Sequence, residues 1–367
     1  MLTGSWLSAP TTTSREGTCS TLLTQNAAQD VCSGGRPVSE DTRLCVHADR
    51  DPSDDTLAMG RMPGIKPSPP PRAEGTVALD DGRLLGYAEY GDARGELVLW
   101  CHGTPGARRQ LPPIAHDAAQ ALGLRILCLE RPGVGDSTDH LYERVSDWAA
   151  DAAAAVDLLG HERFMVVGLS GGGPFALACA HELPDRVVAV GLLGSVTPVT
   201  GDEAVPGAPV SLAVPFNGAI TLLRRPLGIG LWAVVKTITP FAHPLVLATA
   251  RVMPEGDRLV LHDPDLEAMF MGDLAMGGRR QFQAFVNDVI VLGRPWGFKL
   301  SDVKARVCWW HGDADPFVSL DQARRAVSLL PNVELRVRHG ESHLGGLAAA
   351  GEVVTVLSEI WHEASPH

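Results

Sequence analysis

The chain has 367 residues, of which 45% are hydrophobic and 20% are charged, and its formal net charge is −12. A chain of this length can bury a sizeable core, and an acidic balance without a block of Lys or Arg argues against nucleic acid as a partner. The seven cysteines form no C-x-x-C pair and are odd in number. They are predicted to be small buried side chains rather than a disulfide framework, and we expect neither a metal site nor a cofactor.

Residues 1–73 are rich in Ser, Thr, Asp, Gly and Pro and show no sustained hydrophobic period. This composition predicts a disordered, Pro-rich N-terminal extension, because too little apolar surface is available to offset chain entropy. The extension has no basic region followed by an apolar one, so a secretory signal is not expected. The apolar stretch Leu227–Ala250 is interrupted by Lys236 and Pro240, which argues against a membrane span. We therefore expect a cytoplasmic protein.

Strand-like and helix-like segments alternate over residues 74–196, the predicted first part of a core. The first two strands flank the turn Asp80-Asp81-Gly82, which predicts a hairpin. The alternation that follows predicts an α/β fold with a mostly parallel sheet flanked by helices. The predicted strands are Thr76–Leu79, Arg83–Tyr90, Leu97–Cys101, Arg125–Leu129, Phe164–Val167 and Val187–Leu193, and the predicted helices are Arg108–Leu122, Val145–Leu159 and Phe175–Leu183.

The alternation stops at residues 197–298, which are helical, apolar and rich in Pro and Gly, and resumes over residues 299–367. The second part of the core contains two predicted strands, Val303–Trp310 and Val333–Val337, each followed by a helical pattern. An insertion of this kind within a sheet is typical of a helical lid. Its Met, Phe and Trp residues would form a small core and roof a pocket, and few charged groups are expected to face that pocket.

The segment Gly168-Leu169-Ser170-Gly171-Gly172 joins a predicted buried strand to a predicted helix. A serine on so sharp a turn has strained backbone, and the residues two positions away on either side have no room for a side chain. The turn would lift the serine hydroxyl clear of the sheet. A glycine-rich turn in some other α/β protein is the alternative interpretation.

Three further segments follow in an informative order. The first is His102-Gly103-Thr104-Pro105-Gly106, the second holds Asp315 after a strand, and the third is Glu341-Ser342-His343-Leu344-Gly345. The order Ser, Asp, His is the one used by one large group of hydrolases. With these motifs the chain resembles the α/β-hydrolase fold superfamily, in its serine-nucleophile branch with a helical lid, over nearly everything from Gly75 to the end.

The resemblance implies a role for each matching residue. Ser170 would be the nucleophile, His343 the general base and Asp315 the carboxylate that orients the imidazole. The backbone N–H groups of Thr104 and Gly171 would form the oxyanion hole. Gly168 and Gly172 would be the glycines of the nucleophile turn, and no cofactor or metal is implied.

Other residues could take these roles. His339 is the nearest rival of His343, and Asp313, which looks like a turn former, is the nearest rival of Asp315; Asp288 is more remote. His102 is expected to hold the loop that follows its strand, and Arg131 is expected to order the loop that follows the next strand. Neither is expected to react.

The favoured function is hydrolysis of a small or medium, largely apolar carboxylic ester through an acyl-enzyme on Ser170. An amidase or peptidase, a carbon–carbon hydrolase or a cofactor-free haloperoxidase could use the same triad, and a slow-turnover ligand receptor is the alternative from another class. The fold hosts all of them, so the pocket decides. A small molecule is the expected partner, and the sequence leaves its identity and the oligomeric state open.

Overall fold

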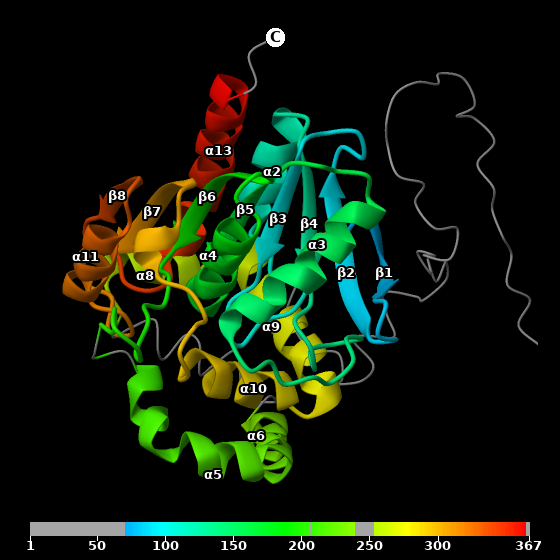
Figure 1. Ribbon diagram of the computed structural model, residues 1–367, viewed down its shortest axis with the longest axis vertical. Coiled ribbons are helices and arrows are strands. Elements are labelled where there is room, and N and C mark those ends of the chain that lie inside the picture. Colours follow the sequence, from blue (N-terminus) through cyan, green and yellow to red (C-terminus); the bar gives the residue numbers. More distant parts are fainter. Residues whose placement is uncertain (1–69, 206, 208, 239–252, 365–367) are drawn as a thin grey trace, which may run out of the picture. The chain divides into compact units, whose positions relative to one another are not determined.

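The computed structural model describes residues 70–205, 207, 209–238 and 253–364, and these residues contain an eight-stranded sheet in the order β1-β2-β4-β3-β5-β6-β7-β8 (Figure 1). Strand β2 runs antiparallel to β1 and β4, and every other neighbouring pair is parallel. The strands are β1 Ala73–Ala78, β2 Leu84–Gly91, β3 Leu97–Cys101, β4 Arg125–Leu129, β5 Phe164–Leu169, β6 Val187–Leu193, β7 Arg306–Gly312 and β8 Val333–Arg338. The α/β class and the mostly parallel sheet predicted from the sequence are confirmed.

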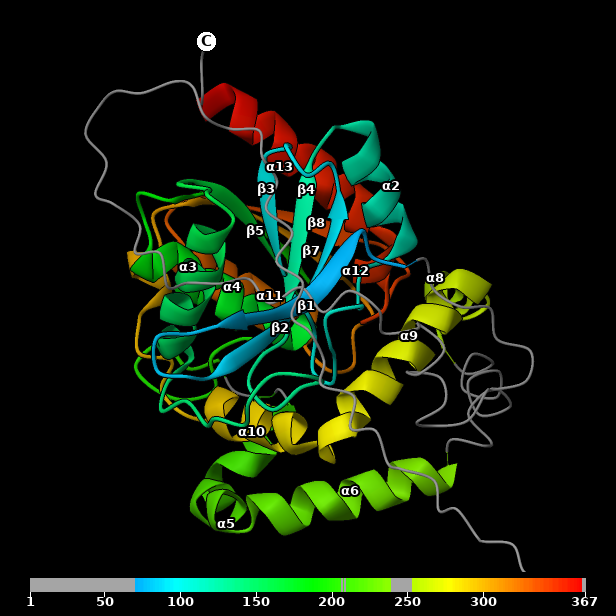
Figure 2. The ribbon, with the colours of Figure 1, turned by 90° about the vertical axis from the view of Figure 1, so that its right-hand side faces the viewer.

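Both faces of the sheet are covered, which is why its central strands are apolar at every position. Along β3, Leu97 and Leu99 join one buried cluster while Val98 and Trp100 join another, as the alternation of side chains requires. Helices α3 and α4 cover one face, and α2 and α13 cover the other (Figure 2). The helices of the core are α2 Pro113–Ala121, α3 Trp148–Leu158, α4 Gly173–Glu182, α11 Leu320–Leu329, α12 Gly345–Ala348 and α13 Ala350–Ala364, with short 3₁₀ turns η1 Val145–Asp147, η2 Ser170–Gly172 and η6 Leu300–Asp302.

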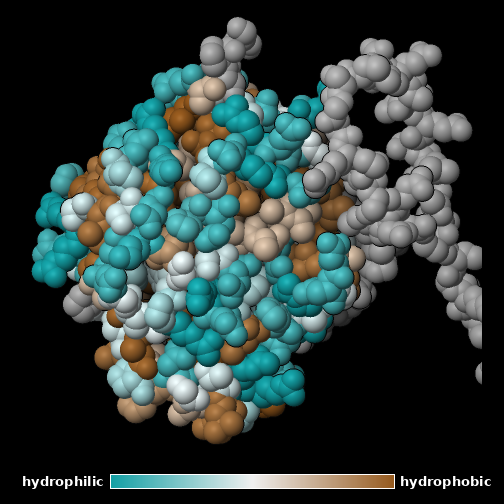
Figure 3. Space-filling view, viewed as in Figure 1, coloured by the Kyte–Doolittle hydropathy of each residue, from teal (hydrophilic) through white to brown (hydrophobic). Residues whose placement is uncertain are grey.

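A helical insertion follows β6 and lies below the sheet in the view of Figure 2. Its described elements are η3 Pro209–Phe216, α5 Asn217–Leu222, α6 Arg224–Ile238, α8 Glu255–Leu261, α9 Pro264–Gly277, η5 Gly278–Arg280 and α10 Gln283–Leu292. Several large apolar side chains of η3, α5 and α6 are exposed, Leu212 and Leu222 most of all. Hydrophobic residues are visible at the lower end of Figure 3, where Figure 1 places α5 and α6. Within the described residues no single helix is long and apolar enough to cross a membrane; η3–α5 and α6 pass together by length and composition, but they are bent by 107°.

One predicted helix starts later than expected. The helix predicted over Arg108–Leu122 begins only at Pro113, because Arg108 and Gln110 turn their side chains inward and the chain between them and the helix is irregular. Proline at the first helical position needs no N–H partner, so it marks the start of α2. Most of the predicted disordered extension, residues 1–69, lies outside the described residues.

Four of the cysteines, Cys101, Cys128, Cys179 and Cys308, are buried and free, which confirms for them the prediction of small core side chains. The other three lie outside the described residues. Burial raises the pKa of the Cys101 thiol to about 12, so this neighbour of the candidate site carries no reactive thiolate.

Candidate active site

Ser170 lies at the carboxyl end of β5, on a sharp turn that requires an unusual backbone conformation. Its φ is +50°, in the left-handed region that non-glycine residues avoid. A Cβ on Gly168 would lie 2.6 Å from Gly173 Cα, and one on Gly172 would lie 2.2 Å from the carbonyl oxygen of Cys101. The two glycines therefore let the turn pack against α4 and β3, and the turn holds the serine hydroxyl at the edge of the sheet.

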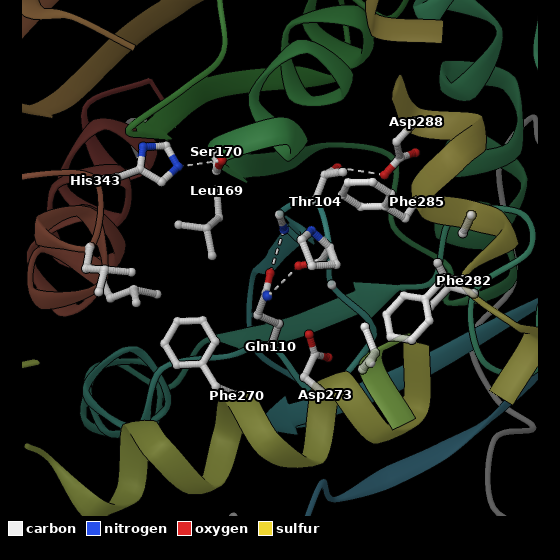
Figure 4. A pocket seen from close by; sticks show the side chains of 18 of the residues that line it. Thr104, Gln110, Leu169, Ser170, Phe270, Asp273, Phe282, Phe285, Asp288 and His343 are labelled. Atoms are coloured by element: carbon white, nitrogen blue, oxygen red, sulfur yellow. Dashed lines mark hydrogen bonds between the residues drawn. The ribbon is translucent and has the colours of Figure 1, made fainter. Parts of the chain in front are cut away.

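The loop after β8 brings His343 to this hydroxyl. Ser170 Oγ lies 2.7 Å from His343 Nε2 (Figure 4), and His343 Nδ1 lies 2.8 Å from Asp315 Oδ2. The carboxylate accepts a hydrogen bond from the N–H at Nδ1, which leaves Nε2 without a proton and able to accept the serine proton. Ser170, His343 and Asp315 thus form one continuous chain of hydrogen bonds, in the arrangement that activates a serine hydroxyl for attack.

Asp315 is held as a carboxylate. Its other oxygen, Oδ1, accepts hydrogen bonds from the backbone N–H groups of Phe317 at 2.8 Å and Val318 at 3.0 Å. Burial opposes ionisation of this group, but the hydrogen bond and charge of His343 together with the two amides outweigh it and keep the pKa of Asp315 below its ordinary value. The acid is therefore charged at neutral pH and able to stabilise an imidazolium.

The rival residues are engaged elsewhere. Asp313 accepts a hydrogen bond from Gly340 N at 2.9 Å and lies 2.9 Å from Nδ1 of His339, whose side chain is 85% exposed. Asp313 is thus the turn former that its position after Gly312 predicts. The structure brings Asp315, and not Asp313, to His343.

The candidate oxyanion donors adjoin one another beside Ser170. An ideal Cβ built on Gly171 would lie 3.4 Å from Thr104 N, so the two residues line the same spot. The guanidinium of Arg131 donates to the carbonyl oxygen of Gly103 at 2.8 Å. Because a trans peptide is planar, with its N–H opposite its C=O, this bond turns the Thr104 N–H away from Arg131. Arg131 therefore fixes the orientation of the peptide whose N–H is the candidate oxyanion donor.

His102 supports the same loop. Its Nδ1 lies 2.8 Å from the Gly103 carbonyl oxygen, and its Nε2 accepts from the backbone N–H of Arg131 at 3.2 Å. Burial, reinforced by the charge of Arg131, lowers the pKa of His102 well below its ordinary value. The imidazole is neutral, with Nδ1 donating and Nε2 accepting, which fits the structural role predicted for it.

The insertion supplies the counter-ion of Arg131. Asp288, on α10, accepts from Arg131 Nη2 at 2.6 Å and from Thr104 Oγ1 at 2.6 Å. Both members of the ion pair are almost fully buried. Sequence reasoning considered Asp288 only as a remote rival of Asp315 and missed this role, since nothing in the local sequence shows which way an acid on a mixed helix points.

A cavity of about 500 Å³ opens beside Ser170, between the loops of the core and the insertion (Figure 4). Most of its lining is apolar, and the aromatic rings of the insertion contribute to it as predicted; these are Phe270, Phe282 and Phe285. The charged residues in the lining are few, as expected, and they are all acids: Glu267, Asp273 and Asp288. No Lys or Arg is among the described lining residues.

Asp273, on α9, is the least compensated of these acids. The residue is 3% exposed, and its Oδ1 has no hydrogen-bond partner among the described residues. Burial, and to a smaller extent the negative charge of Glu130, raises the pKa of Asp273 well above its ordinary value. Within the described chain no group of three or more His, Cys, Asp or Glu could hold a metal ion, so this acid is not part of a metal site of that kind.

Comparison with known proteins identifies the fold. A family model described as alpha/beta hydrolase fold matches residues 96–213. An alpha/beta hydrolase fold protein from Nakamurella multipartita superposes with a TM-score of 0.56 at 24% identity, over 80% of this chain and 100% of that one. The chain has the α/β-hydrolase fold. An esterase from Thermogutta terrifontis shares this fold, with a TM-score of 0.58 at 17% identity over 79% of this chain and 98% of that one.

Curated relatives of this chain carry several activities in their names. A 2-hydroxy-6-oxononadienedioate/2-hydroxy-6-oxononatrienedioate hydrolase of Burkholderia vietnamiensis is 28% identical over 273 residues, which are 71% of this chain and 85% of that protein. A non-heme chloroperoxidase of Streptomyces lividans is 30% identical over 41% of this chain and 55% of its own length. A proline iminopeptidase of Xylella fastidiosa is 30% identical over 36% of this chain and 43% of its own length.

The geometry predicts opposite outcomes for two neighbouring aspartates. Asp315→Asn should fold and lose kcat on the order of 10⁴-fold with little change in KM, because the acid stabilises the imidazolium formed in the transition state. Asp313→Asn is the matched control; it should stay active and lose only about 1 kcal/mol of unfolding free energy. Steady-state kinetics with an activated ester and urea unfolding measure both. An active Asp315→Asn would contradict the assignment.

Arg131 can be tested by separating its effects on stability and on catalysis. Arg131→Gln should lower the free energy of unfolding by about 3–5 kcal/mol, since it leaves Asp288 buried and unpaired. It should also lower kcat about 10²–10³-fold, the usual effect of losing one oxyanion donor. Adding Asp288→Asn should restore much of the stability but not kcat. Recovery of kcat together with stability would show that Arg131 acts on the fold alone.

Proposed function

We propose that the protein is a serine hydrolase that cleaves a small or medium, largely apolar carboxylic ester through an acyl-enzyme on Ser170. The observation that carries this proposal is the chain of hydrogen bonds from Asp315 through His343 to Ser170, whose serine end lines a largely apolar pocket. The α/β-hydrolase fold, shared with an esterase, supports it.

In this proposal the reaction runs in two halves. Ser170 Oγ attacks the ester carbonyl while His343 Nε2 takes its proton, and the oxyanion is stabilised by the N–H groups of Thr104 and Gly171. The protonated His343 then gives its proton to the leaving alkoxide. In the second half His343 removes a proton from water, the water attacks the acyl carbonyl, and the acid leaves as the Ser170 hydroxyl is regenerated.

The charge of the pocket favours an ester over the substrate type named for one relative. The hydrolase of Burkholderia vietnamiensis acts, by its name, on dioates, which carry two carboxylates. Here the described lining holds no Lys or Arg that could pair with two carboxylates, so a dianion would lose its hydration without gaining an ion pair in return. An apolar acyl group would lie against the phenylalanine rings without that cost.

Covalent labelling tests the nucleophile. A fluorophosphonate should label Ser170, and Ser170→Ala should lose both labelling and ester hydrolysis, because no other side chain at the site is activated by His343. Intact-mass spectrometry and turnover of p-nitrophenyl esters measure this, with the matching p-nitroanilides as a control for amide cleavage. Turnover retained in Ser170→Ala would end the proposal, and one slow stoichiometric event in the wild type would favour a receptor.

Acyl-chain length tests the pocket. The value of kcat/KM should rise from acetate to about hexanoate, by about fourfold for each CH₂, since each buried CH₂ is worth roughly 0.8 kcal/mol. A series of p-nitrophenyl esters measures the profile. A flat or falling profile, or a preference for an acyl group that carries a carboxylate, would contradict an apolar acyl pocket.

A further inference from the structure

The polar side chains that line the cavity are almost all engaged. Ser170 and His343 bond to each other, Thr104 donates to Asp288, and Gln110 accepts from Gly103 N at 2.6 Å. Glu267 also has a partner. Asp273 differs from them, because one of its carboxyl oxygens has no hydrogen-bond partner among the described residues. In Figure 4 its carboxyl group points from α9 into the space below Gln110 and beside Phe270.

The carboxyl group of Asp273 accepts a hydrogen bond from the backbone of Ala107, but its Oδ1 is buried without a partner among the described residues. An unsatisfied polar atom in an apolar surrounding costs free energy, and a charged one costs more. The two acids on the insertion's helices illustrate the contrast, since Asp288 has Arg131 within 2.6 Å whereas Asp273 faces the cavity with no described Lys or Arg among the lining residues. The group that would compensate Asp273 is therefore absent from the described walls of the cavity.

The nearby charges indicate the chemistry of that missing group. Burial is the largest cause that raises the pKa of Asp273, and the negative charge of Glu130 adds to it. The hydrogen bond from Ala107 and the positive charges of Arg131 and Arg109 act in the opposite direction but do not reverse the shift. The lining adds the carboxyl group of Glu267 on the same helix. A site of this sign attracts a cation and repels an anion. A single ammonium group can both pair with the carboxylate and supply its missing hydrogen bond.

We propose that Asp273 binds a protonated amine on the substrate, so that the cavity accepts an ester whose apolar part carries an amino group. That the ligand is an ester rests on the proposed function, whereas the ammonium site is inferred from the cavity and its lining residues alone. Asp273 would act as a specificity determinant: it touches the substrate at a distance from the scissile bond and takes no part in bond cleavage.

Direct binding tests the site without turnover. Isothermal titration at pH 8 should give n-hexylamine, which is protonated there, a Kd at least tenfold lower than that of hexan-1-ol or of hexanoate. Hexylamine should also slow fluorophosphonate labelling of the wild type, because it occupies the same cavity. If hexylamine binds but the fluorophosphonate does not label the protein, the ammonium site is supported and the proposed function is contradicted. The failure of one proposal can therefore be told from the failure of the other.

Two variants localise the effect. Asp273→Asn should lose the tenfold preference for hexylamine over hexanol, whereas Asp265→Asn, an acid on the same helix that does not line the cavity, should keep it. Equal binding of the amine and the alcohol by the wild type, or an unchanged preference in Asp273→Asn, would overturn the proposal.

Thermal unfolding of a third variant distinguishes ligand binding by Asp273 from a purely structural role of its carboxyl group. Asp273→Leu replaces the unpaired acid by an apolar side chain that can extend into the cavity, so its melting temperature without ligand should rise above that of the wild type. Its melting temperature should no longer increase on addition of hexylamine, as that of the wild type should. A large fall in the melting temperature of Asp273→Leu would show that the carboxyl group serves the fold, and would overturn the proposal.

Discussion

One buried guanidinium, that of Arg131, holds together the parts from which the candidate site is built. It donates to the carbonyl oxygens of His102 and Gly103, to Thr104 Oγ1 and to the carboxylate of Asp288. Removing such a cation from water costs several kcal/mol, and only this complete set of acceptors offsets that cost. Because the acceptors belong to the loop after β3 and to the insertion, the orientation of the Thr104 N–H depends on both.

Two buried aspartates of the insertion, Asp288 and Asp273, show how the environment gives different roles to one residue type. Asp288 is neutralised by Arg131 and serves the geometry of the oxyanion loop. Asp273 has no such partner within the described residues, and its burial favours the protonated form. A sequence contains both simply as aspartates in apolar helices. The difference arises from which of them lies within hydrogen-bond distance of the buried Arg131.

The sheet and the triad could be predicted from the sequence because local signals fix them. Uninterrupted apolar runs such as Phe164–Val167 can only be strands covered on both faces, and the glycines around Ser170 report a steric limit that the structure reproduces. The start of α2 could not be predicted, since the inward turn of Arg108 depends on ion pairs with distant residues. The position of Asp273 in the cavity wall could not be predicted for a related reason. Helix α9 is apolar nearly all round, so no periodicity in its sequence shows which side faces the cavity.

The position of the insertion also has a consequence for how the chain acquires its fold. Strand β6 ends at Leu193, and β7, its parallel neighbour, begins only at Arg306. During synthesis the half of the sheet that carries Ser170 is therefore complete while one edge of β6 still lacks its partner. An apolar edge left unpaired is a template for association with other chains. Strands β7 and β8, together with Asp315 and His343, can join the sheet only after the whole insertion has been synthesised. An incomplete chain would therefore be both inactive and prone to aggregate.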